Sequence, residues 1–453
     1  MARTPATAWA RLAGRASLAL LPLVAACGLG RQAPLETAVE GASAPPAGTS
    51  SARAAEAKSA GRERPPAVPV TPAAATHGAA PSSGAASPSA GTGATTAREL
   101  ALDLEAGELA LPPGESHVTV ALPPHRLVTI GVVGLRHGLS RLTFDAPHAA
   151  LGTVAPGDGA LPVFVSLATG DAPEPVRFSV TLVAPAHAVG RAVDPDATAA
   201  PSRRDLKRGL ASPRPLVGLP FPQSAADGYV LGSAHRYAFA RVDVAVALRQ
   251  ALAQTRTRFR RNALALHDLS QWDGDRPASD AAMPRHIGHT GGREVDVGLP
   301  SVDDDRSDFT SRCQTIMVDR DVLKCAPGTI KGLDALRLAY FLGLLLDGPT
   351  PEGRYMPEHR PGPVAIVESI LTDQAYVDAV RKVLPELRAR YWIHDDAYGA
   401  LMEEGILRAS PWHVDHVHLR FAGEDGAPLE LAPRPSRTRA EDAEPSWSAG
   451  LRP

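Results

Sequence analysis

The chain has no excess of charge of either sign, because 47 Lys and Arg residues nearly balance 49 Asp and Glu residues and leave a formal net charge of -2. A protein that binds nucleic acid or an anionic membrane surface through charge usually carries a clear basic excess, so neither partner is expected. Beyond the N-terminus, the sequence also lacks an apolar run long enough to cross a bilayer as a helix. Cysteine is scarce, with only 3 in 453 residues.

The N-terminus has the features of an export signal. Basic residues precede a short apolar stretch over 17–26 that ends in small side chains. The run Val24-Ala25-Ala26-Cys27 resembles the lipobox of bacterial lipoproteins, in which the cysteine is lipidated. We therefore expect a signal peptide over 1–26, a lipid anchor on Cys27 and a periplasmic protein held at the outer membrane. The alternative is an ordinary cleaved signal with an incidental cysteine.

Export would place the two remaining cysteines in an oxidising space. Cys313 and Cys325 are then expected to form a disulfide that closes a loop of about 13 residues and adds about 3 kcal/mol of stability in the chain-entropy model. The alternative is two free thiols. Neither cysteine has neighbours typical of a metal site, so neither is counted as a ligand.

Composition divides the mature chain into segments. Residues 27–98 are rich in Ala, Pro, Gly, Ser and Thr and have almost no large apolar side chains, which predicts a disordered tether. A Pro/Arg-rich linker is expected over 188–214 and a loose polar tail over 426–453. The two regions between them, 99–187 and 215–425, are long enough for separate hydrophobic cores.

The first of these regions consists of short runs in which apolar and polar residues alternate, separated by Pro and Gly. The runs lie at 117–122, 127–133, 142–145, 163–167 and 176–183. This spacing is typical of a small antiparallel β-sandwich. The region has no catalytic grouping, so a binding or spacer module is expected, and no ligand is predicted for it.

The second region mixes two periodicities. Helical spacing occurs over 242–253 and 333–346, and again over 373–383 with Thr372 as the expected N-cap. Strands are expected over 263–266 and 363–368. Strands and helices that alternate without a regular βαβ repeat predict an α+β domain.

Two histidine-rich windows lie in this second region. They read His286-Ile-Gly-His289-Thr-Gly-Gly-Arg-Glu-Val-Asp296 and His413-Val-Asp-His416-Val-His418-Leu-Arg-Phe, and they hold five of the 15 histidines. Imidazole and carboxylate are both zinc ligands, and three protein ligands with one open position is the catalytic form of a zinc site. The windows therefore predict a metallopeptidase site.

The expected local structure allows the two windows to meet. His416, His418 and Arg420 alternate with apolar residues, so they share one face of a strand that forms a pocket wall. Glycines disfavour a helix over 286–292, and a loop entering a short strand over 295–297 is expected instead. The alternative for the second window is an amphipathic strand with a solvent-exposed polar face.

The paired motifs His-x-x-His-x-x-Gly-x-x-Val-Asp and His-x-x-His-x-His resemble those of the penicillin-insensitive murein endopeptidases. These bacterial zinc enzymes share a core with D-Ala-D-Ala dipeptidases and the hedgehog signalling domain. The resemblance covers roughly 215–425 and leaves out the tether and the β-rich region. It implies hydrolysis of the D-alanyl–diaminopimelate cross-link peptides of peptidoglycan, with Zn²⁺ as the cofactor.

By position, the resemblance implies that His289, Asp296 and His418 are the zinc ligands. It implies that His416 transfers protons, that His413 is a further active-site histidine and that His286 is an outer residue or an alternative ligand. The chain departs from the family at Gly288, where serine is common, and in about 25 residues inserted after Pro300.

The remaining polar residues of the windows suggest roles in substrate binding. His413 or Arg420 is expected to stabilise an oxyanion. Arg285 or Arg293 is expected to pair with the carboxylates of the substrate. Two alternatives to an endopeptidase remain open: a D,D-carboxypeptidase or dipeptidase on the same core, and a non-catalytic cell-wall-binding lipoprotein.

Overall fold

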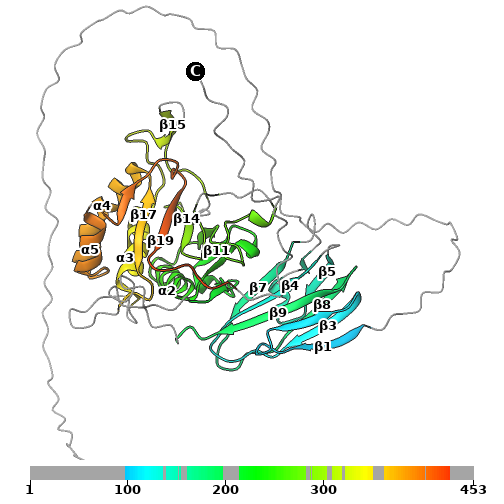
Figure 1. The fold of residues 1–453 in the computed structure, drawn as a ribbon. Helices are drawn as coiled ribbons and strands as arrows, with labels where there is room; N and C mark the ends of the chain where they lie inside the picture. The colour runs from blue at the N-terminus through cyan, green and yellow to red at the C-terminus, as the bar shows by residue number, and fades with distance from the viewer. Residues whose placement is uncertain are drawn as a thin grey trace, which may run out of the picture. The chain divides into compact units, whose positions relative to one another are not determined.

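A computed structural model describes residues 97–428 of the protein, apart from 136–138, 152, 155–160, 197–213, 282–285, 287, 304–308, 319–321, 350–361 and 404. The predicted signal peptide, the lipidation site Cys27 and nearly all of the tether lie outside the described residues, as do Arg285 and most of the tail. Within the described ranges the protein has mixed α/β structure (Figure 1).

The first region folds into two β-sheets. One has the order β1-β3-β8-β5-β6 and the other the order β2-β9-β4-β7. The strands of the first sheet are β1 (Arg98–Leu102), β3 (Gly114–Val120), β8 (Val176–Leu182), β5 (Leu139–Phe144) and β6 (Thr153–Val154). Those of the second are β2 (Glu108–Leu111), β9 (Ala186–Val193), β4 (Leu127–Val133) and β7 (Val163–Ala168). Strand β9 continues into the start of the predicted linker.

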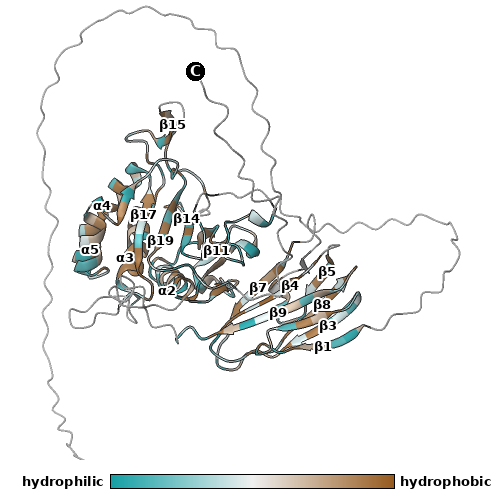
Figure 2. Ribbon diagram, in the orientation of Figure 1, coloured by the Kyte–Doolittle hydropathy of each residue, from teal (hydrophilic) through white to brown (hydrophobic). Residues whose placement is uncertain are grey.

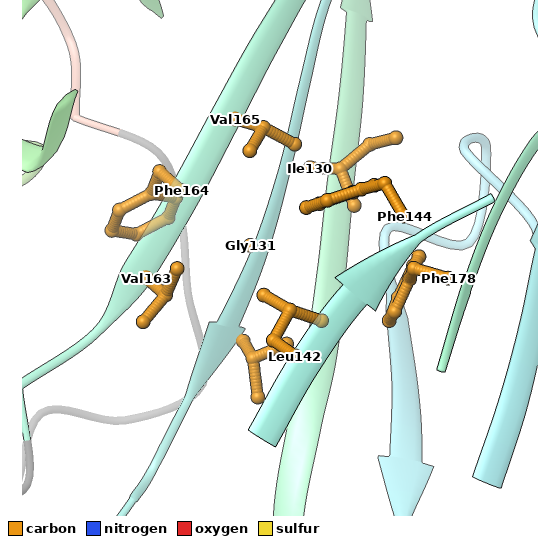
Figure 3. Close-up of a pocket in the computed structure, with 9 residues that line it drawn as sticks. Ile130, Gly131, Leu142, Phe144, Val163, Phe164, Val165 and Phe178 are labelled. Atoms are coloured by element: carbon orange, nitrogen blue, oxygen red, sulfur yellow. The ribbon is translucent and has the colours of Figure 1, made fainter. Parts of the chain in front are cut away.

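Apolar side chains from both sheets fill the space between them. Ile130 of β4, Leu142 and Phe144 of β5, and Phe178 of β8 lie close together there (Figure 3). The cavity that they leave is only about 10 Å³, barely the volume that one water molecule needs. The described side chains are therefore closely packed at this point between the two sheets.

A six-stranded sheet with the order β11-β13-β14-β19-β17-β18 organises the second region. Its strands are β11 (Tyr229–Leu231), β13 (Leu264–His267), β14 (Glu294–Gly298), β19 (His416–Phe421), β17 (Val367–Thr372) and β18 (Leu407–Ala409). Short β10 (Leu216–Gly218) pairs with β12 (Phe239–Arg241). Short 3-10 turns occur at His148–Leu151, Ala225–Asp227, His235–Tyr237 and Ser279–Ala281.

Helices gather beside this sheet (Figure 1). They are α2 (Val242–Phe259), α3 (Ala335–Asp347), α4 (Gln374–Ala389) and α5 (Asp395–Met402). Helices α4 and α5 carry both hydrophobic and hydrophilic residues (Figure 2), and the buried face of α4 includes Tyr376, Val377 and Val380. Such two-faced helices bury one side and leave the other to solvent.

The N-cap of α4 differs from the prediction by one residue. Thr372 is the last residue of β17, and the side chain of Asp373 accepts the hydrogen bond from the Ala375 amide. An ionised carboxylate at this position also interacts favourably with the helix dipole. The strand predicted over 363–368 likewise begins later, at Val367.

Strand β19 shows the predicted alternation. Val417, Leu419 and Phe421 are fully buried, whereas the residues between them are partly exposed. Because successive side chains of a strand point to opposite faces, His416, His418 and Arg420 lie together on the other face. The apolar face thus anchors a rigid strand that presents two imidazoles.

The segment after Pro300 forms a hairpin of β15 (Thr315–Val318) and β16 (Val322–Cys325), and a disulfide joins Cys313 to Cys325. Among the helices of the described residues, none has the length and apolar character needed to span a membrane.

Candidate metal centre

The two histidine windows meet because β14 and β19 are neighbouring antiparallel strands. Their register places Asp296 directly opposite His418, although 122 residues separate the two in sequence. The Nδ1 atom of His418 lies 2.9 Å from Oδ1 of Asp296. Two separate motifs therefore form one site.

His289 reaches the same oxygen from the loop before β14. Its Nε2 atom lies 3.3 Å from Oδ1 of Asp296, and only 2% of the residue is exposed. Its Nδ1 atom lies 3.1 Å from the carbonyl oxygen of Leu269. A carbonyl only accepts hydrogen bonds, so Nδ1 carries the proton and donates it. A ligand histidine commonly donates its second nitrogen to a carbonyl in this way.

The loop that carries His289 has an unusual backbone. His289 has φ 66°, and Gly291 and Gly292 follow with φ 63° and 67°. Left-handed backbone is uncommon for residues other than glycine and occurs often at functional sites, where surrounding contacts fix it. The glycines make the tight turn possible, in agreement with the predicted loop over 286–292.

His416 is the third imidazole at this carboxylate. Its Nε2 atom lies 3.6 Å from Oδ1 of Asp296. Its Nδ1 atom lies 2.7 Å from Oδ1 of Asp415, which must accept the hydrogen bond if it is ionised. Asp415 therefore fixes the tautomer of His416 and leaves Nε2 unprotonated in the neutral ring. Sequence reasoning missed Asp415, although it stands directly before His416.

The second oxygen of Asp296 has no hydrogen-bond partner among the described residues. Only 1% of Asp296 is exposed, and Nε2 of His286 lies 4.0 Å from Oδ2. Buried carboxylate oxygens in proteins are normally hydrogen-bonded or bound to a cation. The unpaired oxygen beside several imidazoles fits a metal ligand.

Charge in the site also favours a cation. Burial alone would raise the pKa of Asp296, but hydrogen bonds from His289 and His418 outweigh burial and hold that pKa well below its usual range. Burial also disfavours the charged form of His289 and so lowers its pKa. The carboxylates of Asp296, Glu294 and Asp268 outweigh this effect and raise the pKa of His289 overall. Asp296 is therefore ionised, and the site attracts positive charge.

Glu294 is a second buried carboxylate that sequence reasoning missed. Its Oε2 atom accepts a 2.6 Å hydrogen bond from the His289 amide and lies 3.5 Å from Nε2 of His418. It supports the left-handed backbone at His289 and orients the ring of His418. A Cβ atom at Gly288 would lie 2.1 Å from this oxygen, so the carboxylate takes the space that a side chain at position 288 would need.

Two overlapping groups of residues bring their ligand atoms within 4.8 Å of one another: His286, His289 and Asp296, and His289, Glu294 and His418. The predicted ligands His289, Asp296 and His418 are divided between these groups and are joined by the contacts with Oδ1. Imidazole nitrogens with one carboxylate are the donor set of catalytic zinc sites. The residues present therefore fit zinc.

His286 lies beside the site and has a partner of its own. Its Nε2 atom is 3.0 Å from Oδ2 of the buried Asp268, and its ring lies 4.7 Å from that of His289. This pairing favours a position for His286 outside the set of metal ligands, in which Asp268 holds its ring next to that of His289.

His413 lies on the other side of the site. Its ring is 4.9 Å from that of His416 and 5.8 Å from that of His418. Its Nδ1 atom donates a 2.8 Å hydrogen bond to the Pro411 carbonyl. Burial lowers the pKa of His413 below its ordinary value, although the Pro411 contact opposes the shift. The ring is thus mostly neutral near pH 7, with Nε2 as a hydrogen-bond acceptor.

Arg420, which was predicted to stabilise an oxyanion, and Arg293, which was predicted to pair with the substrate, both have ion-pair partners within the protein. Nε of Arg420 lies 3.3 Å from Glu368 and 3.6 Å from Glu294. Arg293 donates to Asp425 and to the Gly423 carbonyl. Arg293 is therefore not included in the site, and Arg420 contacts it through Glu294.

No family model and no curated protein matches this chain. Solved structures that are similar to part of it include PliG from Aeromonas hydrophila, a periplasmic inhibitor of g-type lysozyme, with 11% identity and a TM-score of 0.16 over 21% of this chain and 96% of PliG. Another is a de novo designed double-stranded β-helix, with 13% identity and a TM-score of 0.13 over 19% of this chain and 95% of the design. These similarities are too low to indicate a function.

Proposed function

We propose that the protein is a zinc-dependent peptidoglycan endopeptidase that hydrolyses D-alanyl–diaminopimelate cross-links. His289, Asp296 and His418 would hold the zinc. The observation that carries the proposal is the meeting of three imidazole nitrogens within 3.6 Å of one buried carboxylate oxygen, next to a second oxygen for which the described residues offer no hydrogen-bond partner. The resemblance of the paired motifs to murein endopeptidases supports the substrate class.

Bound zinc supplies a Lewis acid that lowers the pKa of water toward about 7 and polarises a peptide carbonyl. His416 is the general base, because Asp415 holds the proton on Nδ1 and leaves Nε2 to accept another. The same nitrogen returns the proton to the leaving amine, and one such group contributes about 10²–10⁴-fold to the rate. The reaction needs no serine or cysteine nucleophile, so a β-lactam has no residue to acylate.

His413 takes a different role from the one expected. Because Nδ1 donates to Pro411 and the ring is neutral, Nε2 accepts a hydrogen bond and does not stabilise an oxyanion. We assign it to accept a hydrogen bond from an N–H group of the substrate.

The test combines metal analysis with digestion of purified muropeptides by the full-length protein. We expect about one zinc per chain and release of monomers from cross-linked dimers, both lost in Asp296→Ala. Release of D-alanine alone would indicate the carboxypeptidase alternative. A protein that holds no zinc and binds sacculi without cutting them would refute the proposal in favour of a wall-binding lipoprotein.

We also propose that lipidated Cys27 anchors the protein in the periplasm, at the outer membrane. The test is fractionation: Cys27→Ala should move the protein from the membrane fraction to the soluble periplasmic fraction. An unchanged membrane fraction would refute the anchor.

A further inference from the structure

The inserted segment after Pro300 forms a structural unit of its own beside the candidate site. Strands β15 and β16 form a separate two-stranded sheet, and the Cys313–Cys325 disulfide closes its base. A two-stranded hairpin alone is at best marginally stable in water. Its position must therefore come from the disulfide and from contacts with the rest of the protein.

Two of these contacts lead to the backbone around His413. The Trp412 amide donates a 3.0 Å hydrogen bond to the Leu323 carbonyl of β16. The Cys325 amide donates to Oδ2 of Asp373 at 3.0 Å, and the Asp373 amide donates to the His413 carbonyl at 3.1 Å. The hairpin is thus joined to residues 410–415, called the His413 loop below. One connection is direct, and the other runs through Asp373, the N-cap of α4.

A third connection runs through a buried tyrosine. The Arg312 amide, next to Cys313, donates a 2.8 Å hydrogen bond to the hydroxyl of Tyr376. That hydroxyl donates a 2.7 Å hydrogen bond to the Val414 carbonyl. Both ends of the disulfide are therefore linked by hydrogen bonds to the backbone at 413–414.

The same segment also contacts His416. Phe309 stacks on the His416 ring with 5.1 Å between centroids and an interplanar angle of 14°. The ring of His267 lies 3.7 Å from Phe309. His416 is thus held by Asp415 at one nitrogen and by an aromatic face from the inserted segment.

The His413 loop needs such support. Trp412 has φ 70°, which is unusual for a bulky residue, and persists only where surrounding contacts fix the backbone. The residue is 51% exposed, so packing of its own side chain supplies little of that restraint. Hydrogen bonds from this backbone to β16, Asp373 and Tyr376 supply part of the restraint, together with those that Thr372 makes with Ser410 and His416.

We propose that the segment 309–325, of which the disulfide closes residues 313–325, positions the two histidines of the proposed reaction, His413 and His416, with Tyr376 and Phe309 as positioning residues. This inference rests on the proposed function. In this proposal the segment belongs to the active site: it fixes the positions of the two histidines and does not bind the metal.

The main test is Tyr376→Phe, which removes one oxygen atom, with Tyr340→Phe in α3 as the matched control. We expect kcat to fall about tenfold in Tyr376→Phe with KM changed less than about twofold, because small displacements of catalytic groups cost 10- to 100-fold. Zinc content should equal that of the wild type, and Tyr340→Phe should keep the wild-type kcat.

A second readout does not depend on activity. In zinc-free protein, amide hydrogen exchange over 410–416 should be faster in Tyr376→Phe and in Cys313→Ser/Cys325→Ser than in wild type. Unchanged exchange together with unchanged kcat, or a loss of kcat that follows loss of zinc, would overturn the inference. If the wild type itself cleaves no muropeptide, the proposed function fails, whereas the exchange experiment still tests the support of the loop.

Discussion

Glu294→Gln is the most informative single change at the candidate metal centre, because it keeps the shape of the side chain and removes its charge. In wild type, Oε2 accepts the His289 amide proton at 2.6 Å and faces Nε2 of His418 at 3.5 Å. A glutamine can keep its carbonyl toward His289. It then presents no negative charge to His418, and its amide group faces Arg420.

The magnitude follows from the role of such a partner. A carboxylate that accepts the second N–H of a ligand histidine fixes the ring and makes it a stronger donor, and its loss usually weakens metal binding 10–100-fold. This corresponds to about 1.4–2.8 kcal/mol. Glu294→Ala should weaken zinc binding further, because the His289 amide would also lose its acceptor where the backbone is left-handed.

The assay is a competition for zinc between the protein and a chromophoric chelator at constant pH. The matched control is Glu368→Gln, since Glu368 also lies near Arg420, at 3.3 Å, but is half exposed and has no contact with a histidine described in the structure. We expect near-wild-type affinity for this control. Equal affinity in Glu294→Gln and wild type would show that the carboxylate does not support the metal ligands.

Four further outcomes are expected. Asp296→Asn should lose both zinc and activity, as measured by metal analysis and muropeptide digestion, and a zinc-loaded active variant would refute the ligand assignment. His416→Ala should keep zinc but lose about 10²–10⁴-fold in kcat; loss of metal instead would make it a ligand. Burial lowers the pKa of His289, but neighbouring carboxylates raise it above 6.5 overall, so protons should compete with zinc and affinity should keep rising with pH above 6.5 in chelator titrations. A flat profile there would contradict this. Gly288→Ala should weaken zinc binding because its Cβ would lie 2.1 Å from a carboxylate oxygen, whereas Gly405→Ala, with nothing within 4 Å, should not.

Alternation in the sequence predicted the elements that carry the site. The pattern of β19 placed His416 and His418 on one face, and the glycines before β14 predicted a loop at His289, as the structure has them. Strongly periodic segments specify their own structure, because only one register buries the apolar side chains. Helical apolar spacing predicted α2, α3 and α4, although α2 and α4 each extend six residues beyond the predicted ends at 253 and 383.

The supporting residues were not predictable in this way. Glu294 stands in a strand and reads as a polar surface residue, because its contact with His418 comes from a distant strand and its contact with the His289 amide depends on the left-handed turn between them. Tyr376 acts through a hydrogen bond to Val414 that only the fold defines, whereas Asp415 is adjacent to His416 in sequence and was missed only because the side-chain orientation of the pair is not readable from the pattern. Strands β15 and β16 were not predicted either, because their apolar residues, such as Ile316 and Met317, are consecutive and do not alternate with polar ones.

The arrangement of carboxylates explains why this site would favour a bound metal ion over a simple ion pair between Asp296 and a protonated histidine. Asp296 has one oxygen shared by three imidazole nitrogens and a buried second oxygen that has no hydrogen-bond partner within the part of the chain that the structure describes. Protonation of one imidazole would satisfy a contact to Oδ1 but would leave Oδ2 buried and unpaired. A divalent cation within reach of Oδ2 of Asp296 and Nε2 of His289 would bind both atoms. Glu294 behind His418 adds negative charge without occupying that position, so the site's electrostatics and its unpaired atom both favour a bound dication.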